Sequence, residues 1–340
     1  MRLARLGELS LIEWVRGRVS YKDKKNLIAG IGDDAAAFRP PRGKIILLTA
    51  DTMAEGVHFS LDWTAPYQLG WKLVSINVSD IYAMGGGPLW AAFELTAPKD
   101  TEEKFIKRLF EGILDALRLY GASLVGGNVS DTKGGLVLSM SVVGQVMGRK
   151  GRPVMRKGAK TGEGVYVTGP LGDSACGLKL LKMINRPVEI EKNKKINRPL
   201  EWEIMRPLLQ RHLMPVLKRP PRNAGASISA MIDISDGLFL DLTRLCKESG
   251  VGVKIYEYKI PISREMKKAA EDLGLDPLAL AGGGGEDYEL LYTAPKATAP
   301  RGGILIGEVI KKGRYLAGKN GKTREMRPTG YTHFGSEGKT

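Results

Sequence analysis

Apolar residues in the first half of the chain follow two periods, one typical of helices and one typical of strands. Between 67 and 84 they recur at near-helical spacing until a Gly-Gly-Gly-Pro sequence stops the pattern. From 102 to 120 they recur at steps of four, from Phe105 to Leu117. Both stretches predict helices. Short β-rich runs predict strands at 44–49, 89–95, 123–125 and 136–146.

A turn-rich, basic segment from 148 to 164 separates this half from the next. We therefore predict two domains, 1–148 and 149–340, because one hydrophobic core rarely grows to 340 residues. The second half predicts strands at 165–168, 231–234, 251–256 and 304–309. Its predicted helices lie at 175–181, 201–217, 236–248 and 264–273. Strands and helices alternate irregularly, so the predicted fold class is mixed α/β with an α+β layout.

The composition is that of a globular protein, with 43% hydrophobic and 26% charged residues. No stretch approaches the roughly 20 apolar residues that a membrane-spanning helix needs. Met1 to Glu8 lacks a continuous apolar region, so we expect neither a signal peptide nor a membrane partner. Only Cys176 and Cys246 are present, without metal-ligand spacing, which favours a reduced, cytoplasmic setting over a disulfide framework.

The charge is strongly basic, since 52 Lys and Arg residues against 37 Asp and Glu residues leave a net charge of +15. Such a field attracts nucleic acids, anionic membranes or phosphorylated metabolites. The basic residues are scattered, and no basic run is interleaved with aromatic residues. We therefore predict a solvated basic surface and anionic small-molecule substrates rather than nucleic acid. A non-catalytic, basic binding protein stays open as an alternative.

Three sequences imitate phosphate-binding motifs and fail on closer inspection. Gly30 to Ala35 fits G-x-G-x-x-A, but Asp33 and Asp34 would place two carboxylates beside a pyrophosphate. Neither the segment 158–161 nor Gly338-Lys339-Thr340 completes a Walker A loop. The three histidines lack zinc-ligand spacing, and no serine occupies a nucleophile elbow.

Acidic residues beside glycine or hydroxyl residues are the stronger signal. Asp34 follows Gly-Ile-Gly, Asp51 ends the first strand, and Asp80 closes Asn-Val-Ser-Asp. A fourth group, Asp233 to Gly237, lies at a strand-to-helix junction. Carboxylate and hydroxyl oxygens without His or Cys are the ligands of a hard cation such as Mg²⁺.

Each of these positions also has a simpler interpretation. Asp34 is a possible turn residue, Asp51 a strand end, and Asp236 or Ser235 a helix cap. Val125-Gly126-Gly127-Asn128 opens a strand into glycines, where bare N–H groups can approach phosphates, although a plain turn is the alternative. Their occurrence together is what favours a site for metal and nucleotide.

Taken in order, the motifs resemble the thiamine-monophosphate kinase family, within the group that includes aminoimidazole ribonucleotide synthetase and selenophosphate synthetase. The motifs that carry the resemblance are GIGDDAA (30–36), TADTMAEGVHF (49–59), NVSDIYAMGG (77–86), LVGGN (124–128), GDSACGL (172–178), DISDGL (233–238), GGGGEDYELL (282–291) and GYTHF (330–334). They span nearly the whole chain. A selenophosphate synthetase should show a reactive Cys or selenocysteine near the N-terminus, which this sequence lacks.

The resemblance implies a two-domain, aminoimidazole ribonucleotide synthetase-like fold. Its β-rich N-terminal half would bind ATP and Mg²⁺ and pair in a homodimer, while its α/β C-terminal half would complete the nucleotide and substrate site. It also implies ATP-dependent phosphorylation of thiamine monophosphate to thiamine diphosphate, by direct in-line phosphoryl transfer with several Mg²⁺ ions.

The resemblance further implies roles for particular residues. The Mg²⁺ ligands would be Asp34, Thr49, Asp51, Asp80, Asp233 and Asp236. Three of these ligands would also be catalytic, namely Asp51, Asp80 and Asp236. ATP would be bound by Gly127, Asn128, Arg149 and Ser235. The thiamine end would be held by His58, Glu286 and Tyr331.

Two positions depart from the family pattern. Asn128 stands where the family has Asp, and Ala50 stands where it has Thr or Ser. Asn128 still offers a neutral oxygen but loses the charge that binds metal, and Asp131 is a nearby carboxylate that would replace it. The departures predict a weaker or missing Mg²⁺ site. A degenerate enzyme, or another ATP-dependent enzyme of the same superfamily with a different substrate, therefore stays open.

Overall fold

The chain folds into two compact units. The computed structural model describes residue 5 and residues 8–22, 25–31, 35–148, 151–192, 195–196, 199–221 and 224–332. Unit 1 consists of Met1–Pro153, Asn185–Lys194 and Leu213–Val216. Unit 2 consists of Val154–Ile184, Lys195–His212 and Leu217–Thr340. No helix within the described ranges is both long enough and apolar enough to cross a membrane.

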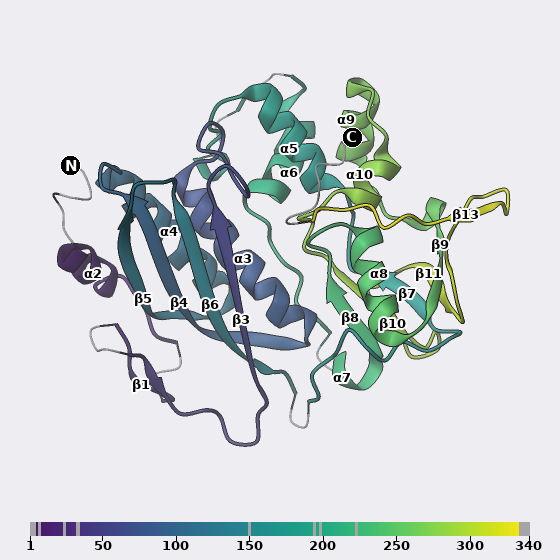
Figure 1. Cartoon of the computed structure of the whole chain (residues 1–340), viewed down its shortest axis with the longest axis horizontal. Helices are drawn as coiled ribbons and strands as arrows, with labels where there is room; N and C mark the ends of the chain where they lie inside the picture. The colour runs from purple at the N-terminus through teal and green to yellow at the C-terminus, as the bar shows by residue number, and fades with distance from the viewer. Residues whose placement is uncertain are drawn as a thin grey trace. The chain divides into compact units, whose positions relative to one another are not determined.

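Unit 1 is built on a four-stranded sheet in the order β3-β6-β4-β5 (Figure 1). Its strands are β3 (Ile46–Ala54), β4 (Gly86–Pro98), β5 (Ser123–Thr132) and β6 (Val137–Val146). β6 pairs antiparallel with both β3 and β4, whereas β4 and β5 are parallel. Side chains alternate between the two faces of the sheet, so that Leu138, Met140 and Val142 are fully buried on one face. The predicted strands are present, although β3 extends to Ala54 and β5 continues through the glycines at 126 and 127. The prediction that Asp51 ends the first strand is therefore wrong, because Asp51 lies inside β3.

Helices α3 (Pro66–Ala83) and α4 (Glu103–Tyr120) pack together on the buried face of this sheet (Figure 1). Glycines allow the two helices to approach closely. A Cβ atom on Gly70 would lie 2.1 Å from the carbonyl oxygen of Leu109, and one on Gly112 would lie 2.0 Å from that of Tyr67. Both predicted helices are confirmed, each within two residues of its expected ends.

Smaller elements complete unit 1. Helix α2 (Glu8–Arg16) packs against α4, where the Trp14 and Phe110 rings meet edge to face at 6.3 Å. β1 (Leu27–Ala29) pairs with β2 (Ala37–Phe38). The 3₁₀ helix η1 (Ile190–Lys192) and the segment 213–216 return to this unit from later in the chain, and Trp71 Nε1 donates to the carbonyl oxygen of Pro215 at 2.9 Å. The sequence pattern did not predict these returning segments.

Unit 2 is built on a seven-stranded sheet in the order β13-β12-β9-β11-β7-β10-β8. Its strands are β7 (Gly164–Val167), β8 (Ala230–Asp233), β9 (Gly252–Tyr256), β10 (Leu290–Ala294), β11 (Ile304–Ile310), β12 (Arg314–Ala317) and β13 (Thr323–Glu325). All neighbours pair antiparallel except β9 with β12. β7 and β10 are buried along their whole length, and the Tyr166 and Tyr292 rings stack between them at 5.3 Å.

The helices of unit 2 are α5 (Asp173–Ile184), α6 (Trp202–Leu213), α7 (Ala224–Ser227), α8 (Leu238–Ser249), α9 (Arg264–Leu273) and α10 (Pro277–Gly283), with the 3₁₀ helix η2 (Glu257–Lys259). The predicted helix at 236–248 begins later than expected, at Leu238, and Gly237 occupies the N-cap position. The interpretation of Asp236 or Ser235 as the cap is therefore wrong. β10, β12, β13 and α10 were not predicted.

Candidate active site

In unit 1, β3 and α3 bring three predicted site residues together. Thr49 Oγ1 donates to Asp80 Oδ2 at 2.5 Å. The backbone N–H of Asp51, two residues along the same strand face, donates to Asn77 Oδ1 at 3.1 Å. Asn77 is fully buried, and its amide nitrogen donates to the carbonyl oxygen of Leu73 at 2.9 Å. This side chain therefore ties β3 to α3 beside Asp80, which lies one helical turn further along α3.

His58 lies in the turn that follows β3. The chain reverses there through Gly56, whose φ of +79° is the left-handed conformation that favours glycine. His58 Nδ1 accepts a hydrogen bond from the backbone N–H of Ala54 at 3.1 Å. An accepting Nδ1 carries no hydrogen, so a neutral ring carries it on Nε2 and presents a donor there. That donor suits a phosphate or another anion.

Gly127 and Asn128 lie within β5, not in the turn that was the alternative interpretation. Gly127 pairs with Phe93, and a Cβ atom at this position would lie only 1.9 Å from the Phe93 carbonyl oxygen, so only glycine fits. Asn128 pairs with Glu94, which places both side chains on the same face of the sheet. Burial raises the pKa of Glu94 above its ordinary value.

Strand register separates these two residues from Asp51. Asp51 pairs with Met140, Met140 with Phe93, and Phe93 with Gly127, so the four lie in line across the sheet. β3 and β5 are the two edges, which puts Asp51 and Gly127 about 14 Å apart at three strand spacings. Asn128 follows Gly127 and therefore points to the opposite face from Asp51. Asp51 and Asn128 of one chain do not share an ion.

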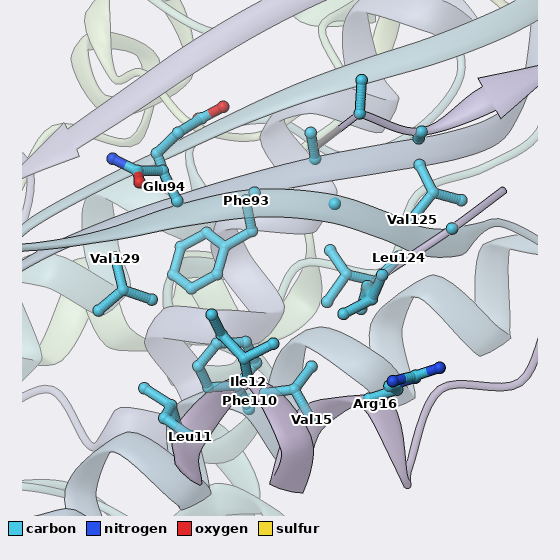
Figure 2. Close-up of a pocket in the computed structure, with 18 of the residues that line it drawn as sticks. Leu11, Ile12, Val15, Arg16, Phe93, Glu94, Phe110, Leu124, Val125 and Val129 are labelled. Atoms are coloured by element: carbon cyan, nitrogen blue, oxygen red, sulfur yellow. The ribbon is translucent and has the colours of Figure 1, made fainter. Parts of the chain in front are cut away.

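A cavity of about 720 Å³ lies beside Gly127, between β5 and α2 (Figure 2). Leu11, Ile12 and Val15 of α2 form one wall and Phe93 lies opposite them, and Phe110 of α4 also lines the cavity. Its polar lining includes the side chains of Glu13, Arg16 and Glu94 and the backbone of Gly126–Asn128. An apolar slot with a few polar groups at its rim is the usual form of a small-molecule site.

In unit 2, backbone hydrogen bonds join three of the motifs. Asp233 ends β8 and is 3% exposed. The N–H of Glu286 donates to the carbonyl oxygen of Ser235 at 2.7 Å, and the N–H of Tyr331 donates to that of Asp236 at 3.0 Å. These bonds bring together Ser235, Asp236, Glu286 and Tyr331, and the fifth predicted site residue of this unit, Asp233, lies two residues before Ser235.

Asp236 is not isolated in this arrangement. Arg244 Nη1 lies 2.5 Å from Asp236 Oδ2 and 2.7 Å from Asp241 Oδ1. The other Asp241 oxygen accepts the backbone N–H groups of Asp236 and Gly237 at 3.0 and 3.1 Å. Asp241 is completely buried, and this burial raises its pKa from 3.8 to about 6. Asp241 and Arg244 therefore fix the backbone and the charge of the DISDGL motif.

Two family models match the chain, the AIR synthase related protein N-terminal domain over residues 32–146 and the C-terminal domain over residues 160–299. The thiamine-monophosphate kinase of Aquifex aeolicus is 37% identical over 98% of this chain and 100% of its own length. The chain belongs to the thiamine-monophosphate kinase family.

Solved structures of the thiamine-monophosphate kinase family agree with this assignment. AaThiL complexed with AMPPCP and TMP matches with a TM-score of 0.73 and 36% identity, over 98% of this chain and 99% of that one. The enzyme from Stenotrophomonas maltophilia K279a matches with a TM-score of 0.75 and 29% identity, over 93% and 97%. The predicted mixed α/β, two-domain fold is confirmed.

Some residues that the family motifs implied are not covered. Asp34 and Arg149 lie outside the described residues, as does His333 of the GYTHF motif. Asp131 does not stand in for the missing charge at Asn128. It lies three residues along β5 on the opposite face, where it pairs with Lys99 at 2.9 Å.

Sequence reasoning missed four residues that hold the site in place, which are Asn77, His212, Asp241 and Arg244. His212 was set aside because it lacks zinc-ligand spacing, yet its Nδ1 lies 3.1 Å from Glu286 Oε2. A usable signal existed only for Asp241, an acid in the first turn of a helix that follows a glycine. Asn77 and His212 depend on contacts between distant segments, whereas Arg244 contacts Asp241 one helical turn before it.

Proposed function

We propose that this protein transfers the terminal phosphoryl group of ATP to thiamine monophosphate, giving ADP and thiamine diphosphate. It is an ATP-dependent kinase of the thiamine-monophosphate kinase family. The observation that carries the proposal is the match to the Aquifex aeolicus enzyme across the full length of both chains. AMPPCP, an ATP analogue that resists transfer, and TMP in the AaThiL complex support ATP and thiamine monophosphate as the two substrates.

The acceptor needs no strong base, because a phosphate monoester oxygen is already ionised near neutral pH. The barrier comes from bringing two anions together in line. In this proposal His58 donates from Nε2 to a substrate oxygen, since Ala54 holds its other nitrogen. Tyr331, which is 47% exposed, offers a ring face to the cationic thiamine end, and Glu286 offers a carboxylate.

The donor set fits Mg²⁺. Among the described residues no three His, Cys, Asp or Glu side chains gather closely enough to hold a metal ion by themselves. Mg²⁺ in nucleotide sites commonly takes one or two carboxylates and completes its shell with phosphate oxygens and water, so dispersed oxygen ligands suit it. Thr49, Asp51 and Asp80 of unit 1, and Asp233 and Asp236 of unit 2, would hold such ions. When bound, Mg²⁺ would neutralise charge on the transferred phosphoryl group.

We place ATP at the cavity beside β5. Backbone N–H groups next to Gly126 and Gly127 suit phosphate oxygens, and the apolar α2 wall suits a purine ring (Figure 2). Glu94 shares a sheet face with Asn128, so it supplies a carboxylate beside the position where the family has Asp. Arg149 and Ser235 stay predicted ATP contacts.

We further propose a homodimer that pairs through the open face of the unit 1 sheet. Leu48 on this face is 73% exposed and Ile46 is 37% exposed, which is apolar surface that a second copy would cover. We expect a cytoplasmic location, to which the buried, free thiols of Cys176 and Cys246 are suited.

The test is formation of thiamine diphosphate from thiamine monophosphate, ATP and Mg²⁺, followed by chromatography. Wild type should make product, Asp51→Asn should reduce the rate at least 100-fold, and Asp272→Asn should not change it. Asp272 is a suitable control because it forms an ion pair with Lys268 on the surface of α9. If ATP is consumed only with another phosphorylated acceptor, the alternative enzyme of the same superfamily is correct. If no acceptor is turned over, the chain is a degenerate kinase.

A further inference from the structure

A side chain of unit 2 that has no assigned role contacts the carboxylate of Glu286, and a second such side chain contacts the first. His212, near the end of α6, places Nδ1 3.1 Å from Glu286 Oε2. Ser174, in the first turn of α5, places Oγ 3.0 Å from the same nitrogen. The His212 side chain is 7% exposed and Ser174 is fully buried, so water competes little for this nitrogen.

The loop that carries Glu286 has an unusual backbone. Glu286 and Tyr288 adopt φ values of +65° and +51°, a left-handed conformation that L-residues rarely take. The fully buried carboxylate of Asp287, between them, accepts the N–H groups of Gly172 and Ser174 at 2.6 and 3.1 Å. These contacts hold the backbone of the loop against the start of α5. Ser174 therefore has two partners: its N–H group binds the Asp287 carboxylate, and its hydroxyl group contacts the His212 ring.

The contacts also decide where the His212 hydrogen lies. A carboxylate only accepts, so the contact of 3.1 Å with Glu286 favours the hydrogen on Nδ1, and the Ser174 hydroxyl then accepts a share of the same hydrogen. Close packing keeps the ring in place, because a Cβ atom on Gly177 of α5 would lie 2.2 Å from the Leu208 carbonyl oxygen and 3.3 Å from His212 Cβ. The ring has little room to move away. Glu286 itself remains 29% exposed, so a ligand can reach it.

We propose that His212, held by Ser174, is a positioning residue that fixes the Glu286 carboxylate for the cationic end of the substrate. The inference rests on the proposed role of Glu286 in holding thiamine monophosphate. A glutamate has three side-chain torsions, and a buried donor on one oxygen removes most of that freedom before the substrate arrives. His212 therefore acts on substrate affinity and does not take part in the transfer itself.

Two substitutions separate positioning from packing. His212→Leu fills similar space without a donor, whereas His212→Asn keeps an N–H group close to the place of Nδ1. We expect His212→Leu to raise the KM for thiamine monophosphate about tenfold, which corresponds to about 1.4 kcal/mol, with less than a twofold change in the KM for ATP. His212→Asn should restore the KM to within about threefold of wild type. If both variants raise both constants equally, the role of His212 is packing alone and the proposal is wrong.

A double-mutant cycle with Glu286→Ala completes the test. In that background His212→Leu should have no further effect on the KM for thiamine monophosphate, because the group that it positions is gone. An additional tenfold rise there, or an unchanged KM in Glu286→Ala alone, overturns the proposal.

Calorimetric binding of thiamine monophosphate without ATP measures the same coupling in the absence of turnover. If wild type binds thiamine monophosphate but forms no thiamine diphosphate, the proposed kinase activity is wrong. The binding constants of wild type, the two single variants and the double variant still decide whether His212 acts through Glu286. Equal losses of affinity in Glu286→Ala and in the double mutant relative to wild type support the positioning role, and additive losses refute it.

Discussion

Gly127→Ala is the substitution for which the structure predicts the clearest effect. The added Cβ atom would lie 1.9 Å from the Phe93 carbonyl oxygen, 2.8 Å from its carbon and 3.0 Å from its nitrogen. All three are backbone atoms of the neighbouring strand, so no side chain can rotate to make room. Cβ atoms essentially never approach within 3.0 Å of another heavy atom, so β5 must move about 1 Å away from β4.

The size of the effect follows from that displacement. Forcing one extra carbon into a packed backbone contact costs about 1–3 kcal/mol. Each kcal/mol lowers the Tm of a unit of this size by about 2–4 °C, so Gly127→Ala should lower the Tm of unit 1 by roughly 2–12 °C. The neighbouring Gly126 is a matched control, because a Cβ atom there would meet nothing within 4 Å.

Differential scanning calorimetry of wild type, Gly126→Ala and Gly127→Ala tests this reasoning. We expect Gly126→Ala to unfold close to wild type and Gly127→Ala to unfold earlier, with weaker binding of AMPPCP because the strand beside the cavity has moved. Equal Tm values for the two variants would refute the argument, since they would show that β4 and β5 separate without loss of stability.

Burial raises the pKa of Asp241 from 3.8 to about 6, so the folded state binds this proton more tightly and stability falls as the pH rises from about 4 to about 6. Urea titrations followed by hydrogen exchange of unit 2 peptides give the unfolding free energies of wild type and of Asp241→Asn. The difference, wild type minus variant, should fall by about 3 kcal/mol between these two pH values. A difference that stays flat or rises contradicts burial as the cause. Asn128→Asp adds a carboxylate to the face that carries Glu94 and should tighten Mg²⁺ binding to the nucleotide complex by about three- to tenfold in calorimetry, and an unchanged affinity excludes residue 128 as a ligand. Gly112→Ala brings a Cβ atom within 2.0 Å of the Tyr67 carbonyl oxygen, so it should lower the Tm by several degrees with unchanged KM values, and a changed KM would show that α3 and α4 set the site.

The sequence predicted those helices and strands well in which the buried face sets a regular spacing of apolar residues. In α4 the apolar residues recur at steps of four and Gly121 ends the helix in the left-handed conformation, so both the helix and its end were predictable. The same holds for the positions of Asp51 and Asp80. A carboxylate on the buried-side face of a strand or helix departs from its apolar pattern, and that departure is visible in one sequence.

Elements defined by distant partners were not predictable in the same way. β5 continues through Gly126 and Gly127 because β4 pairs with it, although glycines weaken the local strand signal. β10 begins within the motif at 282–291, where the glycines at 282–285 leave only a short apolar run as a strand signal. His212 and Glu286 are 74 residues apart, and they meet because α6 and the loop that carries Glu286 both pack against α5.

Strand parity explains why the motif residues could be identified although their grouping could not. Gly127 and Asn128 differ by a single step along β5, and each step reverses the face of the sheet. Gly127 stands in register with Asp51, whereas Asn128, one residue further, faces away from it. A sequence does not give register between strands, so it does not show which carboxylate and which amide serve one ion. The observed register assigns Asp51 to the α3 side with Asp80, and assigns Asn128 to the open face with Glu94.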